Sequence, residues 1–397
     1  MRTRVLVAGG GPAGMMAGLL LARQGVEVTV LEKHADFLRD FRGDTVHPST
    51  LEIIAELGWS REFLALPHDR MREVSVRMGG RTVTIADFSR LKARHPYIAF
   101  MPQWDFLDFL YGKAAAYPGF RLMRSAEATG LIVEDGRVAG ARATTAEGPI
   151  EIGADLVVAA DGRHSALREQ AGLRPVAGSP PMDVLWFRLP RREGERVPFF
   201  QGGRGALVAI DRGDFWQFAY TIPPGAYDLL KADGLPAFHE RIAAFVPDLR
   251  EQVTRLGWDD VHHLAVRVDR LRRWHRPGLL CVGDAAHAMS PAGGVGINLA
   301  VQDAVATANL VGPVLRGRTG PPPESALAAV QARRQFPAKV TQAFQTSILR
   351  ELYPKRLSDD TTGHVPAVFS LFRALPPLRH LAGRFIGLGV RPEHVRD

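Results

Sequence analysis

The chain has 397 residues, 46% of them hydrophobic, and a formal net charge of +8. This is enough apolar material for a large core, and the length favours two lobes. No run of about 18 apolar residues predicts a membrane span, and the apolar run after Met1 is too short for a signal peptide, so we expect a cytoplasmic protein. Only six of the 50 basic residues are Lys and the arginines are scattered, which indicates compositional bias rather than a nucleic-acid partner. The single cysteine, Cys281, excludes an intrachain disulfide and is expected to be a buried thiol.

The N-terminal stretch combines the parts of a dinucleotide-binding unit. A strand, Val5–Ala8, runs into a GxGxxG turn over Gly9–Gly14. Apolar residues at helical spacing follow over Met15–Gln24, Gly25 ends the helix, and a second strand leads to Glu32. The glycines permit close approach of a pyrophosphate to the helix N-terminus, and the carboxylate accepts from ribose hydroxyls. Because that carboxylate repels a 2′-phosphate, the tightly held ligand is expected to be FAD or NAD.

The next segment places three polar side chains in one loop. Arg42, Asp44 and His47 lie within six residues of each other, just before a predicted short helix. Ser49 and Glu52 form a capping box at the start of that helix. The loop is either a solvated connection, or a site in which Arg42 meets phosphate and Asp44 or His47 faces a ligand.

Two predicted hairpins interrupt the alternation of strands and helices. They cover Glu73–Ile85 and Ala128–Thr144, and a helix over Gln103–Ala116 separates them. These insertions argue against a plain dehydrogenase with two mononucleotide-binding halves.

Two further strands end in an acid and a glycine. Leu156–Ala160 is followed by Asp161, and Leu279–Val282 is followed by Gly283 and Asp284. In an open α/β sheet, ligands bind at the carboxyl ends of strands. A glycine-rich helix start follows the second acid, and its N–H groups can stabilise negative charge on a ring.

The region between these strands is aromatic and β-like over Met182–Ile222. Its side chains Trp216, Phe218 and Tyr220 either pack in a core or line an apolar pocket for a flat substrate. A run of β segments of this length indicates a second sheet.

Three stretches resemble, in order and spacing, the FAD-dependent group A aromatic monooxygenases, the family of p-hydroxybenzoate hydroxylase: Gly9–Gly14 with Glu32, Ala160–Arg168, and Gly283–Asn298. The resemblance implies an α/β fold, in which a Rossmann-like FAD-binding domain of the glutathione reductase type carries an interleaved β-sheet substrate domain and C-terminal helices. The implied divisions are the FAD-binding domain (1–72, 101–178 and 271–345), a substrate-domain hairpin (73–100), the substrate-binding sheet (179–270) and a C-terminal helical segment (346–397).

The same resemblance assigns roles to residues. The glycine turn would hold the FAD pyrophosphate, Glu32 the adenosine ribose and Asp284 the ribityl chain. The residues implied to contact FAD are Gly9, Gly11, Pro12, Ala13, Gly14, Glu32, Lys33, Arg42, Gln103, Asp161, Gly283, Asp284, Gly294, Val295, Gly296, Ile297 and Asn298. The candidate catalytic residues are Asp44, His47 and Pro291, the candidate substrate contacts are Trp216, Phe218 and Tyr220, and no metal site is expected. Ala160 and Val295 depart from the family's usual Gly and Gln, at positions that make mainly backbone contacts.

The implied reaction is hydroxylation of an aromatic or polycyclic small molecule. NADH or NADPH would reduce the bound FAD, which reacts with molecular oxygen to a C4a-hydroperoxide that delivers one oxygen atom. Because the chain has one GxGxxG, the nicotinamide cofactor is expected to bind transiently. For a phenolic substrate, Asp44 or His47 could assist deprotonation.

Several alternatives remain open on the sequence. The spacing Phe218-x-Tyr220-x-Ile222-Pro223 matches the WxWxIP signature of flavin halogenases, although both tryptophans are replaced. An oxidase, an isoprenoid reductase or a non-catalytic flavin-binding sensor would have the same FAD-binding fold, because a fold does not determine function. The segment Val365–Val390 is expected to form helices over the substrate lobe or a homodimer contact, with a membrane-surface helix as the alternative.

Overall fold

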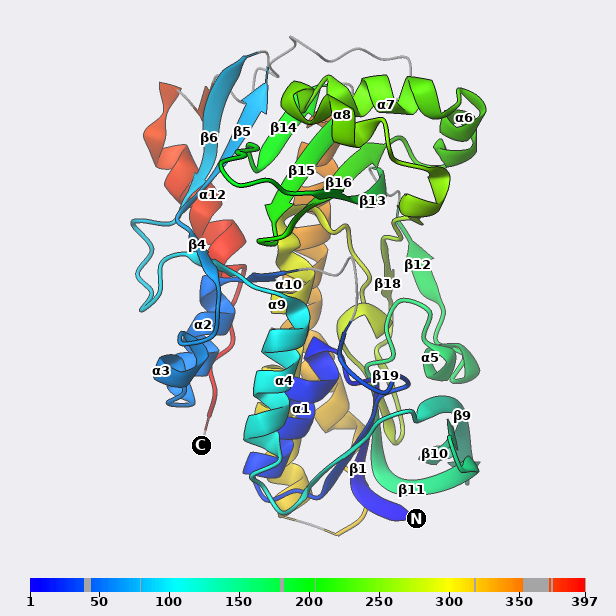
Figure 1. Cartoon of the computed structure of the whole chain (residues 1–397). Helices are drawn as coiled ribbons and strands as arrows, with labels where there is room; N and C mark the ends of the chain where they lie inside the picture. Colours follow the sequence, from blue (N-terminus) through cyan, green and yellow to red (C-terminus); the bar gives the residue numbers. More distant parts are fainter. Residues whose placement is uncertain are drawn as a thin grey trace.

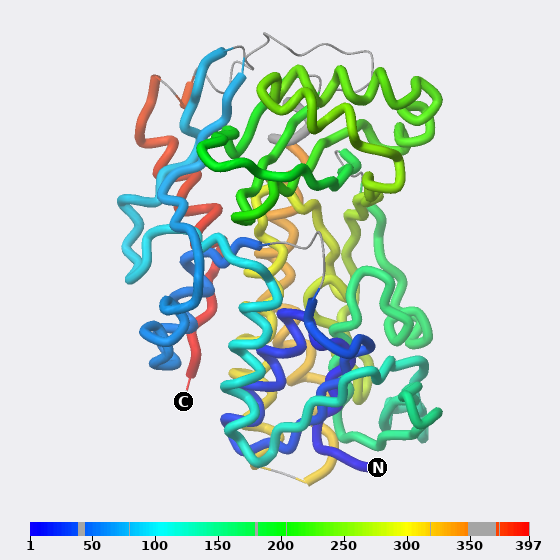
Figure 2. Tube along the Cα trace, in the orientation of Figure 1, coloured from blue at the N-terminus to red at the C-terminus, as the bar shows by residue number. Residues whose placement is uncertain are grey.

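The computed structural model contains two large sheets, with long helices that extend from one toward the other (Figures 1 and 2). It describes residues 1–38, 44–78, 80–178, 182–203, 205–317, 319–352, 371–372 and 374–396, and only the backbone of 348–352. The N-terminal sheet lies at one end of the molecule, and the second sheet lies at the other end beneath a layer of short helices.

The first sheet has the order β19-β20-β11-β1-β2-β8, and the hairpin β9–β10 extends from β11. Strand β1 runs parallel to both β2 and β11, and β20 and β8 continue the parallel set. Its strands are β1 (Arg2–Ala8), β2 (Val28–Leu31), β8 (Phe120–Met123), β9 (Glu127–Glu134), β10 (Arg137–Thr145), β11 (Gly148–Ala159), β19 (His275–Arg276) and β20 (Leu279–Cys281). The central parallel strands are buried on both faces, which explains their continuous apolar sequences.

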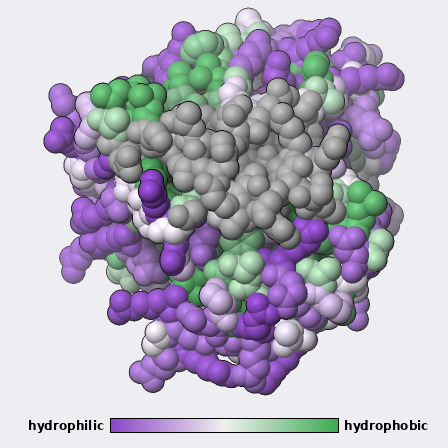
Figure 3. Space-filling model, turned by 90° about the horizontal axis from the view of Figure 1, so that it is seen from above, coloured by the Kyte–Doolittle hydropathy of each residue, from purple (hydrophilic) through white to green (hydrophobic). Residues whose placement is uncertain are grey.

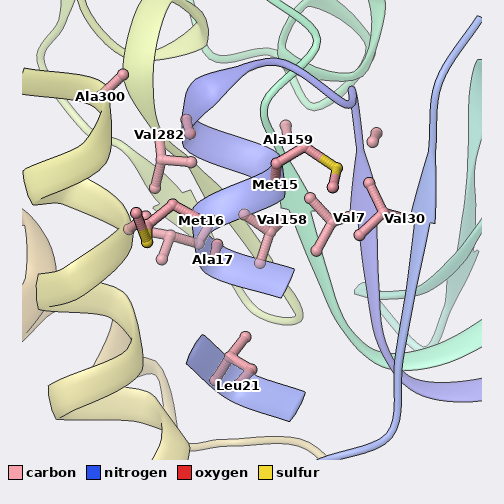
Figure 4. Close-up of a cluster of buried hydrophobic side chains, with 14 of the residues drawn as sticks. Val7, Met15, Met16, Ala17, Leu21, Val30, Val158, Ala159, Val282 and Ala300 are labelled. Carbon is pink, nitrogen blue, oxygen red and sulfur yellow. The ribbon is translucent and has the colours of Figure 1, made fainter. Parts of the chain in front are cut away.

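Helix α1 (Pro12–Arg23) fills the space between this sheet and α9 (Val295–Arg316), as Figure 4 shows. Met15 points toward the strands and Met16 toward α9, and both side chains are fully buried. Burial of one such side chain contributes about 1.5–3 kcal/mol. The helix therefore holds the glycine turn rigidly against the sheet.

The second sheet has the order β17-β13-β16-β15-β14-β5-β6. Its strands are β5 (Glu73–Met78), β6 (Arg81–Asp87), β13 (Asp183–Pro190), β14 (Phe200–Gly203), β15 (Gly205–Asp211), β16 (Phe215–Ile222) and β17 (His262–Leu264). Three helices, α6 (Tyr227–Ala232), α7 (Leu235–Ala243) and α8 (Arg250–Val253), cover one face (Figure 1). The hairpin β5–β6 thus joins strands that lie more than a hundred residues later in the chain.

Smaller elements connect the two sheets. A three-stranded sheet has the order β3-β7-β4, and β12 pairs with β18. The strands are β3 (Thr45–Val46), β4 (Asp69–Met71), β7 (Ile98–Phe100), β12 (Pro175–Ala177) and β18 (Asp269–Leu271). The helices are α2 (Pro48–Glu56), α3 (Ser60–Phe63), α4 (Gln103–Ala114), α5 (Ala166–Gln170), α10 (Glu324–Leu352) and α12 (Pro376–Leu388), with short 3-10 turns η1 (Pro247–Leu249), η2 (Trp258–Asp260), η3 (Gly283–Ala285) and η4 (Ala292–Gly294).

Most local predictions are confirmed, and one is wrong. Both hairpins form, α4 begins at Gln103, and Cys281 is buried, which raises the pKa of its thiol. The capping box at Ser49 is wrong, because α2 begins at Pro48 and Ser49 lies inside its first turn. The proposed boundary between residues 345 and 346 falls inside the continuous helix α10.

Part of the predicted C-terminal segment lies outside the described residues, namely 365–370 and 373. Helix α12 packs against β6 and α2, where Gly383 permits close contact because a Cβ there would lie 2.1 Å from the Asp87 carbonyl oxygen. Seen from the α6–α8 end, hydrophobic side chains form separate patches in a mostly hydrophilic surface (Figure 3). Within the described chain, every helix is too short or too polar to span a bilayer.

Candidate active site

The glycine turn after β1 forms an open cradle. A Cβ on Gly9 would lie 2.4 Å from the Ala160 carbonyl oxygen, and one on Gly14 would lie 1.9 Å from the Gly9 carbonyl oxygen. A Cβ on Gly11 would meet nothing within 4 Å, and no side chain caps the start of α1. Two glycines thus permit close chain packing, and the third leaves space in front of unpaired helix N–H groups.

Glu32 is buried beside this cradle at the end of β2. Its carboxylate accepts from the Gly10 N–H at 3.1 Å and from the His34 N–H at 3.0 Å. Lys33 points elsewhere, since its Nζ lies 3.9 Å from an exposed Glu127 carboxylate. Arg42, expected at the phosphates, lies outside the described residues.

The second and third motifs meet at the carboxyl ends of β11 and β20. The Arg168 guanidinium donates to the Ala285 carbonyl at 3.1 Å, and Arg163 lies 3.8 Å from the half-exposed Asp284 carboxylate. Asp161 is half-buried, and loss of hydration raises the pKa of its carboxyl group. Its Oδ1 has no hydrogen-bond partner among the described residues. These contacts bring together two acids that are 123 positions apart in the chain.

The start of α9 is the third part of the candidate site, after the glycine turn and the carboxyl ends of β11 and β20. Gly294 has φ +63°, and a Cβ there would lie 1.9 Å from the Thr45 hydroxyl, which donates to the Gly294 carbonyl at 3.1 Å. Gly294, at the N-cap, has no side chain to cap the helix, and among the described residues no side-chain hydrogen bond is found for the first-turn N–H groups at Val295 to Ile297. The Asn298 side chain instead accepts from the His47 N–H at 2.9 Å. This turn therefore offers backbone N–H groups to a ligand, and Pro291 precedes it on the surface.

His47 lies inside the protein rather than at an open surface. Its ring is fully buried, and Nδ1 contacts the Ile386 carbonyl at 2.8 Å. Burial lowers the pKa of His47 to about 4, so the imidazole is neutral at physiological pH. This placement joins α2, α9 and α12, and it does not favour the catalytic role expected for this residue.

Asp44 forms a buried ion pair with Arg212, a residue of the turn between β15 and β16. Burial raises the pKa of Asp44 to about 6, and the Arg212 guanidinium opposes that rise. The Arg212 Nε also donates to the Gln217 amide oxygen at 3.1 Å. Arg212 was not identified from the sequence, because no local pattern marks a partner 168 residues away.

The aromatic residues expected to bind substrate belong to the opposite face of the sheet. Phe218 and Tyr220 are buried against α7, with the Phe218 ring 5.3 Å from the Phe187 ring. Alternation along β16 turns Gln217 toward the Arg212 side instead. Phe218 and Tyr220 are therefore core residues, which corrects the sequence-based expectation.

Trp216 shares that core face but also borders a cleft of ≈ 690 Å³. The cleft lies between the small sheet β3-β7-β4 and the ends of β14 and β15. Its apolar lining includes Met71, Val197, Phe199 and Ile210, and its charged lining includes Arg70, Arg191 and Arg196. Phe100 also lines it and pairs in register with Thr45, the neighbour of Asp44, so the cleft lies next to the Asp44–Arg212 pair.

The comparisons with known proteins agree with this arrangement. A family model described as "FAD binding domain" matches residues 2–344. The chain belongs to the FAD-dependent aromatic monooxygenase family. A curated relative, 6-methylpretetramide 4-monooxygenase of Streptomyces rimosus, is 35% identical over 341 residues, which are 84% of this chain and 80% of the relative.

A further relative and a solved structure are also similar to this chain. The 12-dehydrotetracycline 5-monooxygenase/anhydrotetracycline 6-monooxygenase of Streptomyces rimosus is 30% identical over 81% of this chain, which spans 65% of that relative's length. The solved structure of OxyS anhydrotetracycline hydroxylase from Streptomyces rimosus superposes with a TM-score of 0.74 at 25% identity, covering 100% of this chain and 78% of that one. This member of the family is accordingly a flavin-dependent monooxygenase.

The residues present fit the family's FAD. The open space before Gly11, the unpartnered Asp161 oxygen and the uncapped start of α9 are three places where this chain leaves polar groups toward a ligand. We expect Glu32, Asp284 and the two helix starts to hold the dinucleotide. Bound FAD would supply the activation of oxygen, and the protein supplies its orientation and electrostatic surroundings.

Proposed function

We propose that this chain hydroxylates a flat, polycyclic aromatic molecule of the polyketide type, with NADH or NADPH as reductant and molecular oxygen as oxidant. Two curated relatives are named as monooxygenases of tetracycline-type compounds, which supports the substrate class. The observation that carries the proposal is the buried Asp44–Arg212 pair, between the start of α9 and the face of the second sheet that Gln217 occupies.

The pair is suited to a phenol or enol. With its pKa near 6, the Asp44 carboxylate is ionised at neutral pH and can accept a proton from a substrate hydroxyl. The Arg212 guanidinium can then donate to the oxygen that carries the negative charge. Because both groups are shielded from water, this electrostatic stabilisation is stronger than it would be at a surface.

The adjacent cleft suits the rest of a large ring system. Ligand pockets are commonly about 300–1,000 Å³, and the cleft's volume of ≈ 690 Å³ falls within that range. Phe199, Ile210 and Trp216 offer apolar contacts. The arginines of the lining, of which Arg191 pairs with Asp211, can stack on the face of an aromatic ring, and the acids Asp69 and Glu195 lie beside them. A simple phenol would leave most of this surface uncovered.

The test begins with the visible spectrum of the purified protein and its oxidation of NADH and NADPH in air. A panel of tetracycline-type and angucycline-type aglycones, with simple phenols as controls, is then added under isotopically labelled oxygen. We expect a polycyclic compound to accelerate nicotinamide oxidation and to gain one labelled oxygen atom. Peroxide without labelled product would indicate an oxidase, halide-dependent product a halogenase, and flavin that no nicotinamide reduces a sensor; each outcome would overturn the proposal.

A further inference from the structure

A single buried carboxylate holds the loop that begins at Gly283. Asp303, fully buried in α9, accepts from the Gly283 N–H at 3.1 Å and from the His287 Nε2 at 2.5 Å. Gly283 has a left-handed backbone (φ +58°) and directly precedes Asp284. The position of the Asp303 side chain therefore sets the position of the loop that presents Asp284.

Asp303 is in turn fixed by a buried arginine of α10. The Arg334 Nε donates to its other oxygen at 3.0 Å, and the Arg334 side chain is fully buried. Burial alone would lower the pKa of His287, but the Asp303 carboxylate outweighs it and raises that pKa. The Arg334 guanidinium is fully buried, and because a buried charge without enough partners is costly, its other N–H groups need acceptors besides Asp303.

The second carboxylate comes from residues 389–396, which we call the return segment. After α12 this segment runs back along α2 (Figure 2). Glu393 accepts from the Arg334 Nη1 at 3.3 Å and from the half-exposed Arg333 Nε at 2.7 Å. The Arg391 carbonyl also accepts from Arg334 at 3.2 Å. The return segment thus supplies a second carboxylate partner to the buried Arg334 beneath the Gly283 loop.

Contacts on both sides of Glu393 keep the return segment in place. Asn309 of α9 donates to the His394 carbonyl at 2.8 Å and accepts from the Arg396 N–H at 3.1 Å. Glu56 of α2 accepts from the Val395 N–H at 2.8 Å. The segment is therefore bound along its length, and its contacts with the buried Arg334 come from the Glu393 side chain and the Arg391 carbonyl.

We propose that Glu393 is a positioning residue for FAD, which acts through Arg334 and Asp303 on the Gly283–Asp284 loop. The inference rests on the proposed function, because it requires that this loop meets FAD. No part of the return segment belongs to the three motifs by which the cofactor site was identified. The Glu393 carboxylate lies about 110 positions beyond the Gly283–Asp284 loop in the sequence.

The test compares Glu393→Gln with Glu56→Gln, a matched change that loosens the return segment without touching the buried charges. For each variant, the apoprotein is titrated with FAD by flavin fluorescence, and its thermal unfolding is followed without FAD. Loss of one charged hydrogen bond at a buried site predicts that Glu393→Gln weakens FAD binding by about tenfold. Glu56→Gln, at a partly exposed side chain that does not contact Arg334 or Asp303, is expected to change the Kd by roughly twofold at most. Glu393→Asp should recover part of the affinity.

An unchanged Kd in Glu393→Gln overturns the inference, even if the unfolding temperature falls, because stability alone would then explain the contact. If that variant does not fold, Glu393→Asp decides, because it shortens the side chain that contacts Arg334 and keeps the charge: a folded protein with about threefold weaker FAD binding supports the inference, and an unchanged Kd contradicts it. Wild-type protein that binds no FAD refutes the proposed function itself, which separates the two failures.

Discussion

The proposed nucleotide end and the proposed substrate end of this molecule are built by different means. At the nucleotide end the ligand surface is mainly backbone: glycines at close contacts, two uncapped helix starts and a few fixed acids. At the substrate end the surface is side chains, such as Arg212 and Gln217, that strands distant from Asp44 bring into contact. The first kind of site depends on local conformation, and the second depends on sheet register and domain packing.

The largest expected effect comes from Asp44→Asn, which should change turnover at the substrate end without changing FAD binding at the nucleotide end. Removing the carboxylate should lower turnover by about a hundredfold, in line with the loss of a general base. The FAD Kd should stay unchanged, because Asp44 contributes nothing to the nucleotide cradle. In the wild type, activity should fall as the pH drops through about 6, where Asp44 becomes protonated, and this acid limb should disappear in the variant. Steady-state kinetics across pH provide the measurement, and an acid limb that persists in Asp44→Asn would contradict the assignment.

Gly11→Ala should weaken FAD binding and leave turnover unchanged, the reverse of Asp44→Asn. The position has φ −74°, which alanine adopts freely, and the new Cβ meets no protein atom, so folding should be unaffected. The methyl group would occupy the space kept for the pyrophosphate, and an overpacking cost of this kind corresponds to about thirtyfold weaker FAD binding. At saturating FAD, turnover should be preserved. Gly14→Ala serves as the contrast, because its Cβ would meet the Gly9 carbonyl and should prevent folding. Wild-type FAD affinity in Gly11→Ala would show that the cradle lies elsewhere.

A pair of substitutions on adjacent residues tests the two faces of the second sheet. Phe218→Leu opens space under α7 and should cost about 1–2 kcal/mol of unfolding free energy while turnover stays near wild type. Gln217→Leu removes a partner of Arg212 and should lower turnover by about tenfold instead. Urea unfolding and kinetics of both variants give the comparison. If Phe218→Leu is the variant that loses activity, the aromatic face rather than the Arg212 face contacts substrate.

The last effect is expected from His47 and is confined to low pH. Burial lowers its pKa from 6.5 to about 4, so the native state binds fewer protons than the unfolded chain in that window. The stability this group confers is fully present above pH 6.5 and is lost as the pH falls toward 4, a change of up to about 3 kcal/mol. His47→Gln should abolish this component, whereas the same change at the exposed His164 should not. Urea unfolding at several pH values measures it, and equal acid sensitivity of wild type and His47→Gln would exclude His47 as the cause.

Local sequence determined the nucleotide end. The sequence patterns that predict strands, turns and helices are short-range. A glycine required by a close contact can be recognised in the sequence even when the residue it contacts is unknown. The motifs at Gly9, Asp161 and Asp284 could therefore be ordered along one sheet edge before any coordinates were known, because parallel strands present their carboxyl ends together.

Only the tertiary structure decided the rest. The face of β16 that meets the FAD-binding half is the one that the helices leave uncovered. The alternation of side chains along a strand defines two faces but does not tell which of them the helices cover. The partner of Asp44 and the buried links from Asp303 to Glu393 join residues many positions apart, whose charges have no local signature. Pairing of buried charges is fixed by packing, and packing is a property of the folded chain.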